Sequence, residues 1–126
     1  MTRINGSDDC GNSPKNKLVQ QLSIALTLGD IAMLLDSVTD DIYWEIVGER
    51  SIHGKDGLTK ALGRVEPDQL AKLTIEHVLT HGRVGAVNGT AIFSNSNARS
   101  FCDVYEFSGA KGTLVKSIAS YRIDLQ

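Results

Sequence analysis

Apolar residues between positions 18 and 28 recur at mostly helical spacing, in a stripe that polar residues interrupt. Ser13-Pro14 comes just before the stripe. A serine hydroxyl can accept from the free amides of a first helical turn, and proline fits that turn because its φ is fixed and no donor is lost there. The pattern predicts a helix that begins after Ser13 and runs to about Thr27.

Gly29-Asp30 follows at once and predicts a tight elbow between two helices. Glycine is the usual residue just past a helix end, and aspartate is a preferred N-cap. A second, shorter helix is therefore expected over residues 31–37. Asp40 and Asp41 are then interpreted as a turn between helix and strand, because neighbouring strand residues would point to opposite faces and could not form a carboxylate pair.

The pattern next changes to β-rich residues over positions 42–47, which Gly48 closes. Residues 49–53 are expected to return as a short strand. An amphipathic helix is predicted over residues 55–62. A loop follows from Gly63 into the residues before a proline, which avoid helix.

Beyond position 72 only strands are predicted, over residues 73–83, 84–94, 99–108 and 114–125. Turn residues separate them, as expected for hairpin connections. Helices come first and a long antiparallel meander second. This segregation predicts an α+β fold with helices on one face of a curved sheet.

Composition narrows the class of protein. The chain has 126 residues, 41% of them hydrophobic and 22% charged, as expected for one globular domain with one core. The net charge of -2 and the pI near 5.9 argue against nucleic acid and membrane surfaces as partners.

Residues 1–12 are polar and aperiodic, so a disordered tail is expected before a single domain at 13–126. Cys10 and Cys102 form neither a disulfide framework nor a zinc site. With no apolar leader or membrane-spanning run, a cytoplasmic location is expected.

Two histidines fall in the first long strand. Two-residue alternation places His77 on a face with Leu73, Ile75 and His81. The two histidines would then stand roughly 13 Å apart at ~3.3 Å per residue, too far for one metal. His77 is either a hydrogen-bonded core histidine or an acid–base residue.

Asp103 gives the sharpest chemical signal, because alternation groups it with Phe101, Tyr105 and Phe107. A carboxyl in apolar surroundings resists ionisation, so its pKa rises and it can donate a hydrogen bond or act as acid or base. The alternative is an ordinary carboxylate facing water.

Trp44 shares a predicted face with Ile46 and is either a core residue or the wall of a ligand pocket. A slip of one residue would bring Tyr43 and Glu45 into the pocket and turn Trp44 out of it.

Together these motifs resemble the cone-shaped nuclear transport factor 2-like superfamily, and within it the bacterial SnoaL-like polyketide cyclase and ketosteroid isomerase branch. The motifs are Leu28-Gly29-Asp30, the strand from Asp41 to Gly48, Gly54-Lys-Asp-Gly57, Cys102 to Phe107, and Ser117-Ile-Ala-Ser-Tyr121. The resemblance covers residue 13 to the end. It implies a strongly curved antiparallel sheet with the N-terminal helices packed on its concave side, and a homodimer.

The resemblance carries only part of the isomerase chemistry over. The general-base aspartate would fall at Ile46 and the oxyanion-hole tyrosine near Leu22, and neither residue can serve. The second oxyanion donor matches Asp103. Limonene epoxide hydrolase, a relative, holds a water with an Asp-Arg-Asp set; here Ser120 replaces the last aspartate, and Arg99 stands four residues before Asp103 rather than two.

We therefore expect a pocket for a small, largely apolar organic molecule in an isomerase, cyclase or hydratase. Its expected catalytic residues are Asp103 and His77, and its ligand-binding residues are Trp44, Ile46, Tyr105 and Ser120. No metal or other cofactor is implied. A binding or accessory module without turnover is the alternative, and a filled core with a dimerising outer face is a third.

Overall fold

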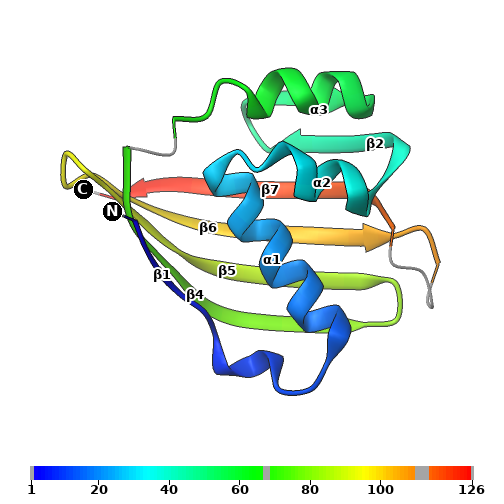
Figure 1. Ribbon diagram of the computed structural model, residues 1–126, viewed down its shortest axis with the longest axis horizontal. Helices are drawn as coiled ribbons and strands as arrows, with labels where there is room; N and C mark the ends of the chain where they lie inside the picture. Colours follow the sequence, from blue (N-terminus) through cyan, green and yellow to red (C-terminus); the bar gives the residue numbers. More distant parts are fainter. Residues whose placement is uncertain (1, 67–68, 110–113, 126) are drawn as a thin grey trace.

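One curved, unclosed sheet of seven strands carries three α-helices on its face in the computed structural model, which describes residues 2–66, 69–109 and 114–125 (Figure 1). The strand order is β1-β4-β5-β6-β7-β2-β3. The strands are β1 (Arg3–Asn5), β2 (Val38–Ile46), β3 (Arg50–His53), β4 (Leu70–His81), β5 (Val84–Phe93), β6 (Ala98–Phe107) and β7 (Val115–Leu125). The α+β fold class is confirmed. The sheet is mixed rather than wholly antiparallel, since β1 pairs with β4 and β2 with β7 in parallel.

The helices are α1 (Pro14–Leu28), α2 (Ile31–Ser37) and α3 (Gly54–Leu62). Ser13 caps α1 by accepting from Asn16 N at 3.1 Å. Gly29 ends α1 in the left-handed conformation at φ 76°, and Asp30 caps α2. The predicted elbow is confirmed.

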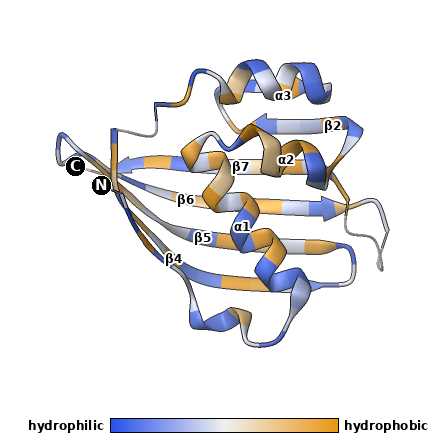
Figure 2. Ribbon diagram, viewed as in Figure 1, coloured by the Kyte–Doolittle hydropathy of each residue, from blue (hydrophilic) through white to orange (hydrophobic). Residues whose placement is uncertain are grey.

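α1 crosses the concave face of the sheet, where it contacts β4 and β5, while α3 packs on β2 and β3 (Figure 1). Apolar and polar residues mix along α1 and alternate along the strands (Figure 2). The inward apolar set of α1 includes Val19, Leu22 and Leu26, each at most 3% exposed. Burying such side chains stabilises a fold by about 1.5–3 kcal/mol each.

The N-terminal segment differs from the expected disordered tail. It forms β1 beside β4 and a short 3₁₀ turn, η1 (Asp8–Cys10). The Asp9 carboxylate accepts from the backbone amide of Val78 at 3.1 Å, and Cys10 is buried. Polar contacts and one buried thiol therefore hold in place a segment that its low apolar content predicted to be disordered.

Asp40 and Asp41 lie within β2 rather than in a turn. β2 begins at Val38, ahead of its β-rich residues, because Val38 already pairs with Val115 of β7. The register of this pairing then shifts between Val38 and Tyr43.

β4 contains a bulge that overturns the expected alternation. Pairing with β5 shifts between Ile75 and His77, so Glu76 is the extra residue. Downstream of it the faces exchange: Val78 is buried, and His77 is exposed with its side chain outside the cone. The expectation that His77 shares a face with Ile75 is wrong.

Candidate functional site

A cavity of about 270 Å³ lies between the concave face of the sheet, the end of α1, and α3 with the segment that follows it. The segment after α3 and the start of β4 contribute Val65, Glu66, Gln69 and Leu70 to its lining. The polar and charged lining residues are Thr27, Trp44, Arg50, Glu66, Gln69, Arg99, Asp103 and Arg122. The remaining lining residues are apolar, so polar and apolar side chains share the wall of the cavity.

Asp103 is the buried carboxyl of this cavity, with 4% of its surface exposed. Ser120 lies directly across the β6–β7 ladder, and its hydroxyl donates to Asp103 Oδ1 at 2.6 Å. The indole Nε1 of Trp44 donates to Ser120 Oγ at 2.9 Å. A hydrogen-bond chain therefore runs from β2 through β7 to the carboxyl on β6.

Burial raises the pKa of Asp103 above its ordinary value. Hydrogen bonds from Ser120 and Ser23 and the charge of Arg122 act in the opposite direction, and desolvation outweighs them. Ser120 Oγ accepts from the Trp44 indole and donates to Asp103 Oδ1, while Ser23 is a second hydrogen-bond partner of the same carboxyl.

Tyr105 and Ile46, both predicted to bind ligand, are buried at 0% and 1% exposure and lie outside the lining of this cavity. The Tyr105 hydroxyl is 2.6 Å from the hydroxyl of Ser23 on α1, and burial raises its pKa well above the ordinary value. The phenol therefore stays neutral and supports the wall behind Asp103. Ser120 is also outside the cavity lining, whereas Trp44 is one of the lining residues.

The structure does not bring His77 to Asp103. The His77 ring is on the outer side of the sheet, where Nδ1 lies 3.3 Å from Asp9 Oδ2 and 72% of the side chain is exposed. The bulge at Glu76 causes this, because it reverses the direction of every later side chain.

Arg122 is a cavity residue that the sequence reasoning missed. It pairs across the ladder with Phe101, and its guanidinium lies 5.5 Å from the Trp44 ring centroid. Alternation could have found it, because Arg122 follows Ser120 by two residues on the same strand. Phe101 is two residues before Asp103, where the epoxide hydrolase resemblance implies an arginine; the cation here comes from the neighbouring strand.

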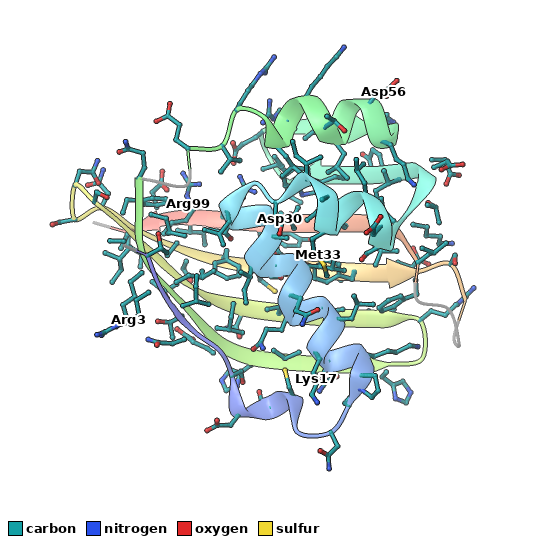
Figure 3. All side chains as sticks on the ribbon, viewed as in Figure 1. Arg3, Lys17, Asp30, Met33, Asp56 and Arg99 are labelled. Carbon is teal, nitrogen blue, oxygen red and sulfur yellow. The ribbon has the colours of Figure 1, made fainter. Side chains whose placement is uncertain are left out.

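Arg99 reaches the same cavity from the start of β6 (Figure 3). Its Nε donates to Asp124 Oδ1 at 2.9 Å, and its guanidinium lies 5.5 Å from the Phe93 ring centroid. Figure 3 shows Arg99 near the end of β7, on the side of the sheet where the chain leaves α3. The wall beyond Asp103 is therefore cationic as well as apolar.

Within the described ranges, no three His, Cys, Asp or Glu side chains gather as metal ligands would. No helix in the described part of the chain has both the length and the apolar run to cross a membrane.

Comparison with known proteins gives matches in structure only. No protein-family model matches the chain, and no curated protein matches its sequence. An NTF2-like protein of unknown function from Cytophaga hutchinsonii is 23% identical, with a TM-score of 0.65 over 86% of this chain and 99% of that chain.

Two further similar structures are of proteins named for an enzymatic activity. A putative ketosteroid isomerase from Kribbella flavida is 14% identical, with a TM-score of 0.72 over 89% of this chain and 79% of that one. An epoxide hydrolase from M. tuberculosis, described as LEH-like, is 18% identical, with a TM-score of 0.67 over 86% and 82%. The fold of this chain is therefore that of the nuclear transport factor 2-like proteins, and the resemblance is confirmed at the level of fold.

Proposed function

We propose that this protein is an enzyme that moves a proton on a small organic molecule, as an isomerase, cyclase or hydratase, with Asp103 as its acid. The observation that carries the proposal is the carboxyl of Asp103 on the cavity wall, 4% exposed and fixed by Ser120. Burial keeps such a group protonated at a pH where an exposed aspartate has ionised.

The neutral carboxyl donates its proton to an oxygen of the substrate, a carbonyl or an epoxide. The resulting carboxylate then takes a proton back. In an isomerase that proton comes from a neighbouring C–H bond, in a cyclase from the attacking hydroxyl, and in a hydratase from the attacking water. One residue can therefore act as acid and then as base.

Ser120 and Trp44 position this acid. The Trp44 indole can only donate, so it holds Ser120 Oγ in place while the Ser120 hydroxyl donates to Oδ1. That hydrogen bond also stabilises the carboxylate formed after proton transfer. The ketosteroid isomerase and epoxide hydrolase titles among the structural neighbours support the same kind of chemistry.

The test combines protonation with turnover. Carboxyl carbon NMR should show Asp103 titrating above its ordinary value of 3.8. Turnover of a panel of small enones and epoxides should be lost in Asp103→Asn, while binding measured by thermal shift is retained. Asp41→Asn is the matched control, because that carboxyl is exposed and outside the cavity lining.

An Asp103 that titrates at or below 3.8, or an Asp103→Asn variant that keeps full turnover, would contradict the proposal. Retained binding in the wild type with no turnover of any panel member favours the non-catalytic binding module instead.

We also propose a homodimer formed through the outer face of the sheet. Leu79, Tyr121 and Ile123 are 59%, 48% and 66% exposed there and line one shallow depression. Ile123→Glu should convert the dimer to monomer in sedimentation velocity. A wild type that sediments only as a 13.6 kDa species contradicts the dimer.

A cytoplasmic location completes the proposal. Cys10 and Cys102 are free thiols, and burial raises the pKa of both. Such thiols suit a reducing compartment.

A further inference from the structure

Positive charge gathers at the cavity although the chain as a whole has a net charge of -2. Arg50, Arg99 and Arg122 all line it, from three different strands. The acidic lining residues are Glu66, which is exposed, and Asp103, whose ionisation burial disfavours by raising its pKa. Asp124, outside the lining, forms an ion pair with Arg99 at 2.9 Å, so Arg50 and Arg122 contribute most of the excess positive charge. The local field at the wall is therefore that of a site for an anion.

Arg122 is the centre of this charge. Its side chain is partly buried, and burial lowers its pKa from the ordinary value. A guanidinium nevertheless remains protonated at every pH at which the protein is folded. Among the residues that the structure describes, no carboxylate lies within ion-pair distance of it. Asp103 and Glu49 act on its charge only from beyond ion-pair distance. A partly desolvated cation without a direct ion pair is unfavourable, so an anion that binds it gains more than it would at the surface.

Neutralising Asp103 is the simplest alternative role for Arg122. The geometry does not support it, because the two groups form no ion pair and the pKa of Asp103 is raised in spite of the nearby charge. The guanidinium instead lies over the Trp44 ring, which holds it at the cavity wall. In this position its N–H groups can donate to a bound ligand.

We propose that the ligand of this cavity is a small organic acid whose carboxylate is bound by Arg122, with Arg50 and Arg99 attracting it at the mouth. This inference rests on the proposed function, since it names the substrate class of the same site. A planar guanidinium suits a carboxylate because its N–H groups match both oxygens. The apolar part of the acid contacts Phe101 and Phe93, and its reacting oxygen faces Asp103.

The cavity limits the size of this acid. At ~30 Å³ per water molecule, 270 Å³ holds about nine waters, so a ligand of comparable atom count fits. Benzoate, phenylacetate, cyclohexanecarboxylate and octanoate are suitable probes. Each has a neutral amide of the same shape and size.

Trp44 reports binding at this site directly. It is the single tryptophan of the chain and lines the cavity, so fluorescence excited selectively at tryptophan, above the absorption of the three tyrosines, comes from the site alone. We expect at least one of the four acids to give a saturable fluorescence change, with an affinity about tenfold or more above that of its amide.

Arg122→Gln should weaken binding of that acid by about tenfold or more and leave binding of the amide unchanged. Arg83→Gln removes the same charge from an exposed turn outside the cavity lining and is the matched control. Isothermal titration calorimetry repeats each affinity without relying on the stacked indole.

Three results would overturn the inference: none of the four acids binds, an acid and its amide bind equally, or Arg122→Gln and Arg83→Gln weaken the acid to the same extent. Equal binding of acid and amide leaves the proposed proton transfer intact. Failure of the Asp103 titration or of the Asp103→Asn turnover test removes the proposed function, while a preference for acids would still define a binding site.

Discussion

Replacing the buried acid by its neutral isostere should stabilise the protein. In Asp103→Asn the amide oxygen can still accept from Ser120 Oγ, and the amide nitrogen takes the place of the second carboxyl oxygen as a donor. The variant keeps the shape of the side chain and removes only its ability to ionise. We expect a higher free energy of unfolding than in the wild type at neutral pH.

The size of this gain follows from proton linkage. In the unfolded chain Asp103 ionises near 3.8, whereas in the folded chain burial raises its pKa. Between those two values the folded state binds more protons than the unfolded state, so wild-type stability falls by about 1.4 kcal/mol per pH unit. Below 3.8 both states are neutral and the gain of the variant vanishes.

Urea denaturation of both proteins at a series of pH values measures this difference. The gain should begin near pH 3.8, grow as the pH rises, and level off at the folded pKa of Asp103, which the experiment thereby determines. The exposed Asp41→Asn should stay within about 0.5 kcal/mol of the wild type throughout. A flat difference for Asp103→Asn, or a loss of stability that grows with pH, would refute the reasoning, because it would mean that the folded state favours the carboxylate.

Three further perturbations test the supporting structure. Ser120→Ala leaves the Trp44 indole without its acceptor, so urea denaturation should show a loss of about 1–3 kcal/mol; NMR should show a higher pKa for the buried carboxyl, and an unchanged pKa would contradict the hydrogen bond. Gly89→Ala would place a Cβ against the backbone oxygen of Thr74, so we expect the free energy of unfolding to fall by at least the ~1–3 kcal/mol typical of overpacking. A variant with the Tm of the wild type would contradict this close approach of the two strands. Hydrogen bonds from the Val78 amide and from His77 lower the pKa of Asp9, so its contact with β4 is lost only as the pH falls below 3.8 through the folded pKa. Amide exchange in β1 should accelerate in that pH range, and also at neutral pH in Asp9→Asn. Unchanged exchange in both cases would show that this contact does not hold β1 in place.

Local features of the fold could be predicted because their causes are local. Ser13, Gly29 and Asp30 occupy cap positions that depend on a few neighbouring residues, and the structure confirms all three. The neighbourhood of Asp103 was predicted for the same reason, since alternation within one strand places it among aromatic side chains.

The misplacement of His77 has a different cause. Alternation continues only while the pairing is regular, and β4 changes phase where Ile75 lies opposite Gly89. The glycine leaves room for the close approach of the β4 backbone, so the bulge depends on two strands rather than one. The sequence alone does not reveal it, because Leu79 continues the alternation from Ile75, whereas the structure buries Val78 and leaves Leu79 exposed.

The site itself is a property of strand pairing. Asp103 faces Ser120 and Phe101 faces Arg122 across the same ladder, so a single register brings the acid, its hydrogen-bond donor and the cation to one wall. A slip of one residue between β6 and β7 would separate them all. Trp44 resists such a slip, because it ties β2 to Ser120 and lies against Arg122.

This arrangement explains why the acid and the cation belong to one function. A carboxyl whose pKa burial raises lowers stability at neutral pH, and a partly buried guanidinium without a direct ion pair adds to that penalty. A fold selected for stability alone would place apolar side chains at Asp103 and Arg122. Their joint presence on one wall is accounted for by a bound molecule that carries a negative charge for the arginine and an oxygen for the acid.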